Sequence, residues 1–348
     1  MARSALIRWL AASALALALL GAGGWLLLER IDERHLDTPI AGLSGPRSVV
    51  IQPGSSLTAA ARTLATAGLL DHPGSWIRQA RREDAAGRIR AGEYRVAPGA
   101  TPRDLLEMLV EGRVQLHSIT LPEGWTFRQA LDEITAHPAV TVTLADVPGE
   151  QVMAALGLAG RNPEGMFFPD TYLFARGTAD LELLRQASER LQRELDLAWA
   201  DRVADLPISS AYEALILASI VEKETGIADE RPIIAGVFVN RLRRGMRLQT
   251  DPTVIYGLGD SFDGNLRRAD LTRDTPYNTY TRSGLPPTPI ALVGREALRA
   301  AVRPAETEAL YFVATGRGDG RHLFARTLAE HNGNVARYIA TLRGAGRQ

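Results

Sequence analysis

One feature restricts the fold of this chain more than any other: an unbroken apolar run near its start. Residues 9–28, WLAASALALALLGAGGWLLL, are twenty consecutive uncharged positions, about the length of a helix that crosses the hydrocarbon core of a membrane. Arg3 and Arg8 precede this run. Because basic flanking residues stay on the cytoplasmic side, we expect residues 1–8 in the cytoplasm and the rest of the chain beyond the cell inner membrane, in the periplasm.

A cleaved signal peptide is the alternative interpretation of the same run. The apolar letters WLLL (25–28) continue past the small residues GAGG (21–24), where cleavage would fall. The sequence therefore favours an uncleaved, single-pass anchor. Residues 29–46 are polar and punctuated by Gly and Pro, and we interpret them as a linker.

The stretch after the linker contains a repeated pattern. IQPGSSLTAAARTLATAG (51–68) and VAPGATPRDLLEMLVEG (96–112) align at a Pro-Gly pair and at a following Ser or Thr, and LPEGWTFRQALDEI (121–134) is a looser third copy. Each copy predicts a short strand, a turn, an N-cap and an amphipathic helix. In the third copy, Thr126 and Gln129 have the spacing of a capping box, in which two side chains satisfy backbone N–H groups at the helix start.

Two consecutive copies predict a compact βααβ module over residues 47–115, because one copy alone is too small to bury its apolar face. In its pattern, this stretch resembles the LysM-type carbohydrate-binding modules. The resemblance implies a glycan-binding module. A structural duplication that only packs against its neighbour is the alternative, and the sequence leaves both open.

The remaining chain divides into a connecting subdomain over 116–160 and a larger domain over 161–344, which begins with the aromatic-rich segment EGMFFPDTYLF (164–174). Residues 245–293 are rich in Gly, Pro, Thr, Asn and Tyr, and we expect a long irregular loop of the kind that carries function. Apolar periodicity predicts the other elements and an α+β fold class. These elements are helices over 180–205, 212–225, 230–244, 294–301 and 328–342, and a strand over 309–314 followed by a turn.

The helix expected over 212–225 is apolar until its last turn, where it carries Glu222 and Glu224. Residues two positions apart on a helix point in directions that differ by about 200°. The carboxyl groups of Glu222 and Glu224 therefore point away from each other and cannot share one cleft. The positions seven and three before Glu224 are Leu217 and Val221. Glu224 therefore lies on the more apolar stripe of the helix.

This position is expected to raise the pKa of Glu224. Desolvation disfavours the charged carboxylate, and the unpaired carbonyl groups at a helix end repel it. We expect Gly226 to end the helix in the left-handed conformation. A carboxyl group that stays protonated near neutral pH is able to protonate a glycosidic oxygen. From these residues alone, two solvated charges at a helix end remain the alternative.

The order of motifs resembles that of the lysozyme-like lytic transglycosylases: a helix that ends in Glu-Thr, then a Gln in a loop, then Tyr-Asn. The similarity is more specific to the endolytic murein transglycosylases of the MltG (YceG-like) family, which are membrane-anchored and carry a LysM-like module before a mixed α+β catalytic domain. Three segments carry it: LASIVEKET (217–225), VFVNRLRRGMRLQTDPTVIYGLG (237–259) and TPYNTYTRSGLPPTPI (275–290).

This resemblance implies a lyase that cleaves the β-1,4 bond between N-acetylmuramic acid and N-acetylglucosamine within peptidoglycan strands, without water, and leaves 1,6-anhydromuramoyl ends. It implies that Glu224 is the catalytic residue, first as acid and then as base, and that Glu222 is its unreactive neighbour. It also implies peptidoglycan synthases, the penicillin-binding proteins, as partners. The hydrogen-bonding and aromatic side chains of the loop predict a substrate-binding set: Gln249, Thr250, Asp251, Tyr256, Tyr277, Asn278 and Tyr280.

Asp251 has two interpretations. A hydrolytic muramidase would use it as the second carboxylate beside Glu224. An Asp directly before Pro252 is more often a turn former that bonds its own backbone, and we favour this structural or positioning role. A non-catalytic, membrane-tethered glycan-binding scaffold is the other alternative function.

Charge and ligand content argue against other classes of protein. Forty basic and forty acidic residues cancel, so nothing indicates nucleic acid as a partner. The chain has no cysteine, and His322 and His331 do not have the spacing of metal ligands. The predicted chemistry needs no metal and no other cofactor.

Overall fold

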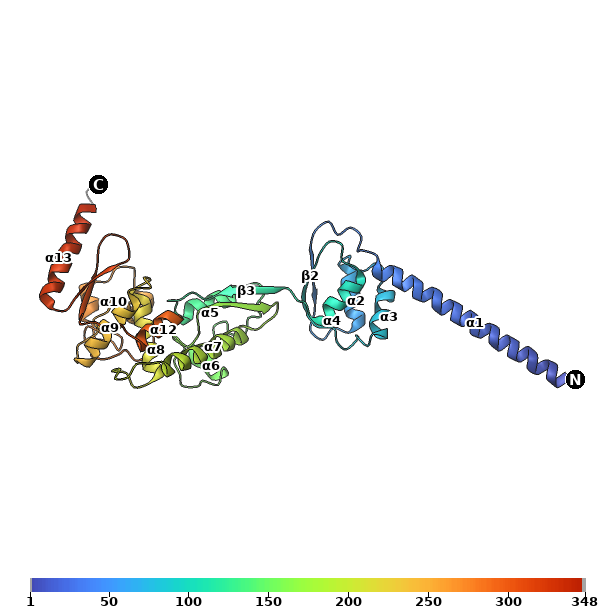
Figure 1. Cartoon of the computed structure of the whole chain (residues 1–348), viewed down its shortest axis with the longest axis horizontal. Coiled ribbons are helices and arrows are strands. Elements are labelled where there is room, and N and C mark those ends of the chain that lie inside the picture. Colours follow the sequence, from blue (N-terminus) through green and yellow to red (C-terminus); the bar gives the residue numbers. More distant parts are fainter. Residues whose placement is uncertain (1, 346–348) are drawn as a thin grey trace. The chain divides into compact units, whose positions relative to one another are not determined.

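The computed structural model describes the backbone of residues 2–345 and, apart from residues 2–7, 10, 11, 14 and 345, their side chains. The chain forms two compact units, Met1–His117 with Phe174–Gly177 and Ser118–Leu173 with Thr178–Gln348. Helices dominate both units, and the described strands pair into two-stranded sheets (Figure 1). The predicted α+β class is confirmed.

The first unit contains a βααβ module followed by one further helix. Its two strands pair antiparallel, with Ile51 opposite Gly92. Trp76 and Tyr94 are fully buried in a single apolar core, to which both strands and the helices contribute. The elements are β1 (Arg47–Ile51), α2 (Leu57–Thr66), α3 (Pro73–Arg82), β2 (Gly92–Val96) and α4 (Pro102–Glu111). The strand and helix of each copy, β1 with α2 and β2 with α4, are those that the repeat predicts, and α3 lies between the two copies.

Each copy of the repeat begins its helix with the predicted cap. The hydroxyl groups of Ser56, Thr101 and Thr126 accept backbone N–H groups three residues later. Thr126 and Gln129 form the predicted capping box. The third copy, β3 (Leu116–Thr120) and α5 (Phe127–Ala136), has the same local structure although its helix belongs to the second unit.

Helix α1 (Ala2–Asp37) extends farther than the sequence predicts. Residues 29–37, which we expected in a linker, continue this helix. Asp32 is fully buried and accepts hydrogen bonds from Arg78 Nε at 2.9 Å and from Arg82 at 3.2 Å. Leu36 joins the apolar core of the module. The polar letters around residue 32 therefore serve to dock the helix, which a pattern of apolar residues does not reveal.

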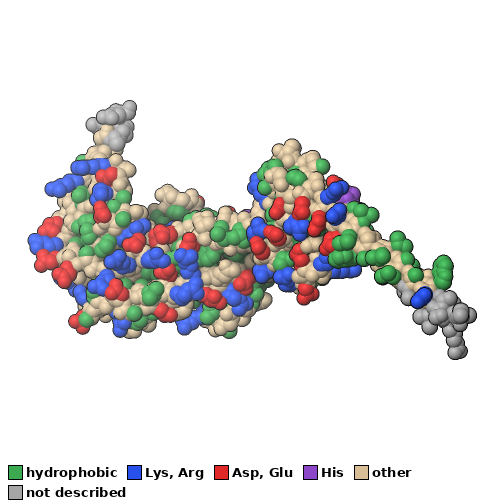
Figure 2. Space-filling model, turned by 45° about the vertical axis from the view of Figure 1, so that its right-hand side comes forward, with side chains coloured by type: hydrophobic (Ala, Val, Ile, Leu, Met, Phe, Trp, Pro, Cys, Tyr) green, Lys and Arg blue, Asp and Glu red, His purple; other side chains and the backbone are tan. Residues whose placement is uncertain are grey.

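The predicted membrane anchor, residues 9–28, lies within α1. The side chains at three of its positions, 10, 11 and 14, lie outside the described residues. Among the residues that the structure describes, no helix combines the length and the hydropathy of a membrane span. Figure 2 shows hydrophobic side chains, in green, along the described part of this helix. The exposed large apolar residues here include Trp9, Leu15, Leu17, Leu19, Leu20, Trp25, Leu26 and Leu27.

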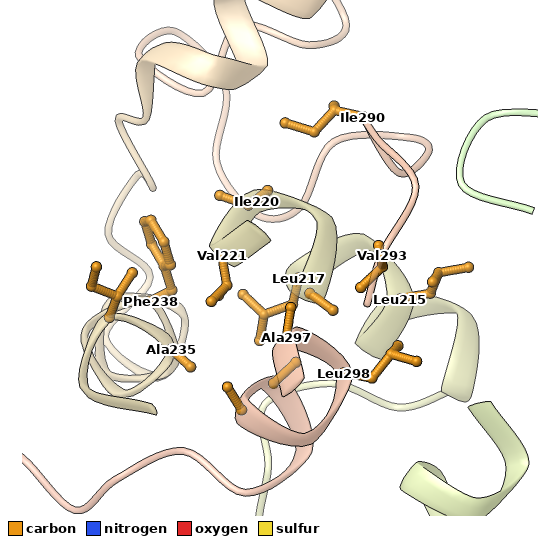
Figure 3. Packing of buried hydrophobic residues seen from close by; sticks show 14 of the residues in the cluster. Leu215, Leu217, Ile220, Val221, Ala235, Phe238, Ile290, Val293, Ala297 and Leu298 are labelled. Atoms are coloured by element: carbon orange, nitrogen blue, oxygen red, sulfur yellow. The ribbon is translucent and has the colours of Figure 1, made fainter. Parts of the chain in front are cut away.

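Helix α8 lies at the centre of the second unit. Its residues from 214 to 221 are all buried, as expected for a helix that is apolar on every side. Figure 3 shows Leu217 and Val221 of α8 packed with Ala235 of α9 and Leu298 of α12. Besides α5, the helices of this unit include α6 (Gly149–Ala155), α7 (Asp180–Ala200), α8 (Ala211–Glu224), α9 (Arg231–Arg243) and α12 (Arg295–Val302).

Residues 245–293 contain more helix than we expected. Helix α10 (Asp251–Leu258) and the short helix α11 (Arg268–Thr272) lie within this stretch. Pro252 stands in the first turn of α10, where a missing N–H costs no hydrogen bond. The prediction of a structureless loop was wrong here because an Asp-Pro pair starts a helix as readily as it forms a turn.

The last described elements are a hairpin and a helix. Strands β5 (Tyr311–Ala314) and β6 (His322–Ala325) pair antiparallel, and α13 (Leu328–Ala345) packs beside them. The predicted strand, turn and closing helix are confirmed. A further strand, β4 (Thr171–Ala175), pairs with β3.

Candidate active site

Glu224 is the last residue of α8, and its side chain is only partly exposed. The helix ends here because Thr225 takes an extended conformation (φ −150°, ψ 136°), and its hydroxyl accepts the N–H of Ile227 at 3.0 Å. Gly226 is not among the residues with positive φ. The expected left-handed glycine was therefore wrong, and a threonine ends the helix instead.

Thr250 holds the carboxyl group of Glu224. Its hydroxyl donates a hydrogen bond to Glu224 Oε1. Thr250 is itself buried and fixed, since its N–H donates to Thr279 Oγ1 at 3.1 Å and its carbonyl accepts the Thr253 hydroxyl at 2.8 Å. The orientation of the carboxyl group is thus determined by residues that cannot easily move.

These surroundings raise the pKa of Glu224 to about 7. Burial is the main cause because it disfavours the charged form. The hydrogen bond from Thr250 opposes this, the negative charge of Asp251 adds to it, and His322 and Arg241 oppose it. Near neutral pH the protonated and charged forms therefore coexist, which suits a group that donates a proton and later accepts one.

A cavity of about 170 Å³ borders Glu224. Arg241, which the sequence analysis did not identify, is one of the residues that line this cavity. This guanidinium is buried, and it donates to the carbonyl groups of Leu310 at 2.6 Å and Leu248 at 2.7 Å. Arginine supplies nearly all the basic residues of the chain, so no local signal marked this one. The lining residues are Glu224, Arg241, Leu248, Gln249, Asp251, Tyr280 and Phe312.

Three of the predicted substrate-binding residues line this cavity. Gln249 is exposed and has φ +51°, a left-handed conformation that is uncommon outside glycine and that occurs at functional sites. Asp251 is exposed at the start of α10 and accepts the Tyr280 hydroxyl at 2.6 Å. Burial and the Asp251 carboxylate both raise the pKa of Tyr280, so its hydroxyl keeps the proton that it donates.

Tyr256 and Tyr277 lie together but do not line the Glu224 cavity. Their rings meet edge to face with centroids 4.9 Å apart, and the Tyr277 hydroxyl is 2.9 Å from Thr288 Oγ1. Glu164, which the sequence did not single out, is buried beside the Tyr256 hydroxyl and accepts the Phe127 N–H at 3.0 Å. Burial raises the pKa of Glu164 to about 7.

Asn278 differs from the prediction. Its side chain is fully buried, and its amide N–H groups donate to the carbonyl oxygens of Asp270, Leu271 and Arg273. Its side-chain oxygen accepts the Tyr280 N–H at 2.9 Å. Asn278 therefore shapes the loop that presents Tyr280, and its hydrogen-bonding groups are not turned toward a ligand.

A larger cavity, of about 390 Å³, borders the other end of α8. It contains no residue of the predicted site. Its lining is mostly apolar, without the buried carboxyl group and strained backbone that distinguish the smaller cavity. We place the site at the smaller cavity because its residues have the chemistry. The larger cavity is lined by Leu156, Leu158, Arg161, Met166, Arg185, Ser188, Glu189, Leu191, Gln192, Leu195, Ala211, Tyr212 and Leu215.

The family can be assigned by comparison with known proteins. A model of the YceG-like family matches residues 49–337, which include both the βααβ module and Glu224. This chain belongs to the YceG-like family. The prediction of that family from the segments around Glu224, Gln249 and Asn278 is confirmed.

The YceG-like relatives include curated proteins and a solved structure. The "Endolytic murein transglycosylase" of Bacillus subtilis is 29% identical over 311 residues, 84% of this chain and 85% of that protein. The protein of the same name from Streptococcus pneumoniae is 28% identical over 93% of this chain, which spans only 64% of that relative. The crystal structure of a YceG-like protein from Listeria monocytogenes is 29% identical with a TM-score of 0.51, over 83% of this chain and 98% of that chain.

Proposed function

We propose that this YceG-like chain is an endolytic peptidoglycan lytic transglycosylase that cleaves the β-1,4 bond between N-acetylmuramic acid and N-acetylglucosamine within glycan strands. The observation that carries the proposal is Glu224, a carboxyl group with a pKa raised to about 7 and held by Thr250 at the edge of a cavity. The relatives from Bacillus subtilis and Streptococcus pneumoniae, both called "Endolytic murein transglycosylase", support the proposal.

In the proposed reaction, Glu224 acts twice. Its protonated form donates to the glycosidic oxygen, the bond to C1 of the muramoyl residue breaks, and the other sugar leaves with a hydroxyl group. The Glu224 carboxylate then takes the proton of the muramoyl C6 hydroxyl, whose oxygen bonds to C1 and closes the 1,6-anhydro ring. Glu224 is protonated again at the end, and no water is consumed.

Asp251 supports a second candidate, a hydrolytic muramidase. It lines the same cavity as Glu224, and its charge acts on that carboxyl group. Hydrolysis would need Asp251 to activate a water or to bond the sugar. The hydrogen bond from Tyr280 at 2.6 Å occupies one of its oxygens, so we favour a positioning role for Asp251.

The nature of the new ends distinguishes the two reactions. The full chain is incubated with purified peptidoglycan, and the products are separated and weighed by mass spectrometry. The proposal expects muramoyl ends lighter by one water than reducing ends. Reducing ends alone would identify a muramidase. Products from the interior of long strands, rather than single disaccharides released from an end, would support endolytic cleavage.

We also propose that residues 9–28 anchor the chain in the cell inner membrane, with the catalytic unit in the periplasm. The exposed apolar side chains along α1, such as Leu15 and Leu20, support this proposal, and so do the basic residues before residue 9. Fractionation of cells tests it. The full chain should stay with membranes in high salt and in carbonate, and protease should reach residues beyond 29 only from the periplasmic side.

For the βααβ module we propose glycan binding, supported by its LysM-like sequence pattern and by its own apolar core. Sedimentation of the full chain carrying Glu224→Gln with insoluble peptidoglycan would measure binding without cleavage. A cleavage enzyme at the membrane would meet newly made strands, so we propose peptidoglycan synthases as partners. Crosslinking in cells followed by identification of the linked protein tests that part.

A further inference from the structure

A buried carboxylate and a partly buried imidazole form a pair that stands beside the active site and has no role in the reaction above. Glu230 directly precedes α9 and is 5% exposed, and His322 begins β6. Ring atom Nδ1 of His322 lies 2.8 Å from Glu230 Oε2, and the His322 backbone N–H donates to Oε1 at 3.1 Å. Because the carboxylate accepts both bonds, Nδ1 carries a hydrogen and Nε2 is the ring nitrogen left for proton exchange.

The His322 ring of this pair contacts the wall of the cavity that borders Glu224. The His322 ring meets the Phe312 ring at 90°, with centroids 5.4 Å apart. Phe312 lines the cavity that borders Glu224. The charge of His322 also reaches Glu224 directly and favours its charged form. The imidazole is thus near enough to affect the reacting carboxyl group without contacting it by a hydrogen bond.

We propose that the Glu230–His322 pair is a second acid–base element of this active site, whose imidazolium form stabilises the carboxylate that Glu224 becomes once it has donated its proton. The inference rests on the proposed function and deepens it. His322 is a positioning residue in this scheme, because it acts through Glu224. Glu230 fixes the ring, because its carboxylate accepts hydrogen bonds from both the imidazole and the backbone N–H of His322.

The other charges around the pair do not provide the same control. Arg321 lies 3.9 Å from Glu230 and 4.0 Å from Asp229. Arg241 acts on Glu224 in the same sense as His322, and Asp251 acts in the opposite sense. Arginine and aspartate keep their charges around neutral pH, whereas histidine is able to change its charge there.

A kinetic test uses His322→Asn in the full chain. The asparagine amide can replace Nδ1–H as donor to Glu230, so the pair's structural bond is kept while the imidazolium is lost. We expect Glu224 to become a weaker acid. The kcat should fall about tenfold with KM within about twofold, and the alkaline fall of the pH–rate profile should move to higher pH. Glu230→Gln should move it in the same direction by less.

His331→Asn is the matched control. His331 stacks on Tyr311, with ring centroids 5.2 Å apart, on the neighbouring strand, and it has no place in the proposed pair. Its substitution should leave the alkaline limb where the unsubstituted chain has it. If the His322→Asn limb also coincides with that of the unsubstituted chain, whatever its rate, the proposal is overturned.

A second test does not depend on activity. Coupling between two titrating groups is reciprocal, so removing the Glu224 charge must lower the pKa of His322. NMR titration of histidine-labelled full chain would follow its six histidines, with His322→Asn identifying the signal. A lower His322 pKa in the Glu224→Gln chain supports the proposal, and an unchanged one overturns it. Absence of anhydro products, by contrast, would contradict the proposed function without contradicting the coupling between His322 and Glu224.

Discussion

The two ends of helix α8 border two different cavities. At its start, near Tyr212, a cavity of about 390 Å³ is walled mostly by leucines and other apolar side chains. At its end, near Glu224, the cavity is less than half as large, about 170 Å³, and is bordered by two carboxyl groups, a guanidinium and a phenol. At this second end the pKa of Glu224 is raised to about 7, so its protonated and charged forms are both present near neutral pH.

The difference shows that size does not identify the reactive end of this helix. The residues of α8 from 214 to 221 are all buried, so the packing of its middle does not distinguish its two ends. The reactive group lies where the helix ends. There the carboxyl group of Glu224 meets a loop that can form a hydrogen bond with it, through Thr250. The following experiments perturb the two ends separately.

The largest effect is expected at the end of α8. Glu224→Gln removes the acid and the base together, and cleavage of purified peptidoglycan should fall by a factor on the order of 10²–10⁴. Glu222→Gln is the matched control: Glu222 accepts the Gly294 N–H at 3.0 Å on another side of the helix. That variant should keep most of the activity. Equal losses in both variants would remove the distinction between the two carboxyl groups.

At the start of α8, a change should affect stability rather than chemistry. Leu191 lines the larger cavity and is 2% exposed. Leu191→Ala should lower the free energy of unfolding by about 2–5 kcal/mol, since it removes buried methyl groups and enlarges the cavity. The pH–rate profile of the folded fraction should stay unchanged. Denaturant unfolding measures the first effect. A displaced pH profile would mean that the two ends of α8 are coupled.

Glu224, at the end of α8, should also make the free energy of unfolding of the chain depend on pH. In the folded chain the pKa of Glu224 is raised from an ordinary 4.5 to about 7, so the folded state disfavours its charged form. Because of this group, the free energy of unfolding decreases as the pH rises from 4.5 through 7. Glu224→Gln should be more stable than the unsubstituted chain at pH 8, by about 3 kcal/mol at most, and by much less at pH 5. Thermal unfolding at both pH values measures this, and a pH-independent difference would contradict it.

The smallest effect is expected from the loop. Thr250→Val removes the hydroxyl that bonds Glu224 and keeps the shape of the side chain. Because this hydrogen bond favours the carboxylate, its loss should raise the pKa of Glu224 and move the alkaline limb of the pH–rate profile upward, with a rate change of about three- to tenfold. Thr253→Val is the control, since the Thr253 hydroxyl bonds Thr250 and Thr279 but not Glu224. A limb that moves equally in both variants would assign the effect to packing.

Local patterns predicted the parts of the structure that local physics determines. The caps at Ser56, Thr101 and Thr126, the wholly buried middle of α8 and the closing hairpin and helix all follow from residues within a few positions of each other. The raised pKa of Glu224 was also predictable, because the apolar residues on its own helix stripe contribute to its burial.

The rest depends on contacts between distant parts of the chain. Glu230 and His322 are 92 positions apart, and Arg241 meets Leu310 across 69. The periodicity of apolar residues in the sequence does not predict contacts between residues so far apart. Asn278 was misassigned for a related reason: the motif predicts that the residue matters, but only the folded loop shows that its amide is used to bond its own backbone. A family motif thus mixes residues that shape a site with residues that face it.

The docking of Asp32 against Arg78 and Arg82 has a mechanical consequence. Helix α1 has 36 residues, about 54 Å at the usual rise. Its final turns are held against the module by the buried carboxylate of Asp32 and by Leu36. The helix continues without a break through residue 29. Helix and module would therefore tilt together, so a change in the angle of the helix would be transmitted in full to the βααβ module. A proline placed near Arg30 would disconnect the two.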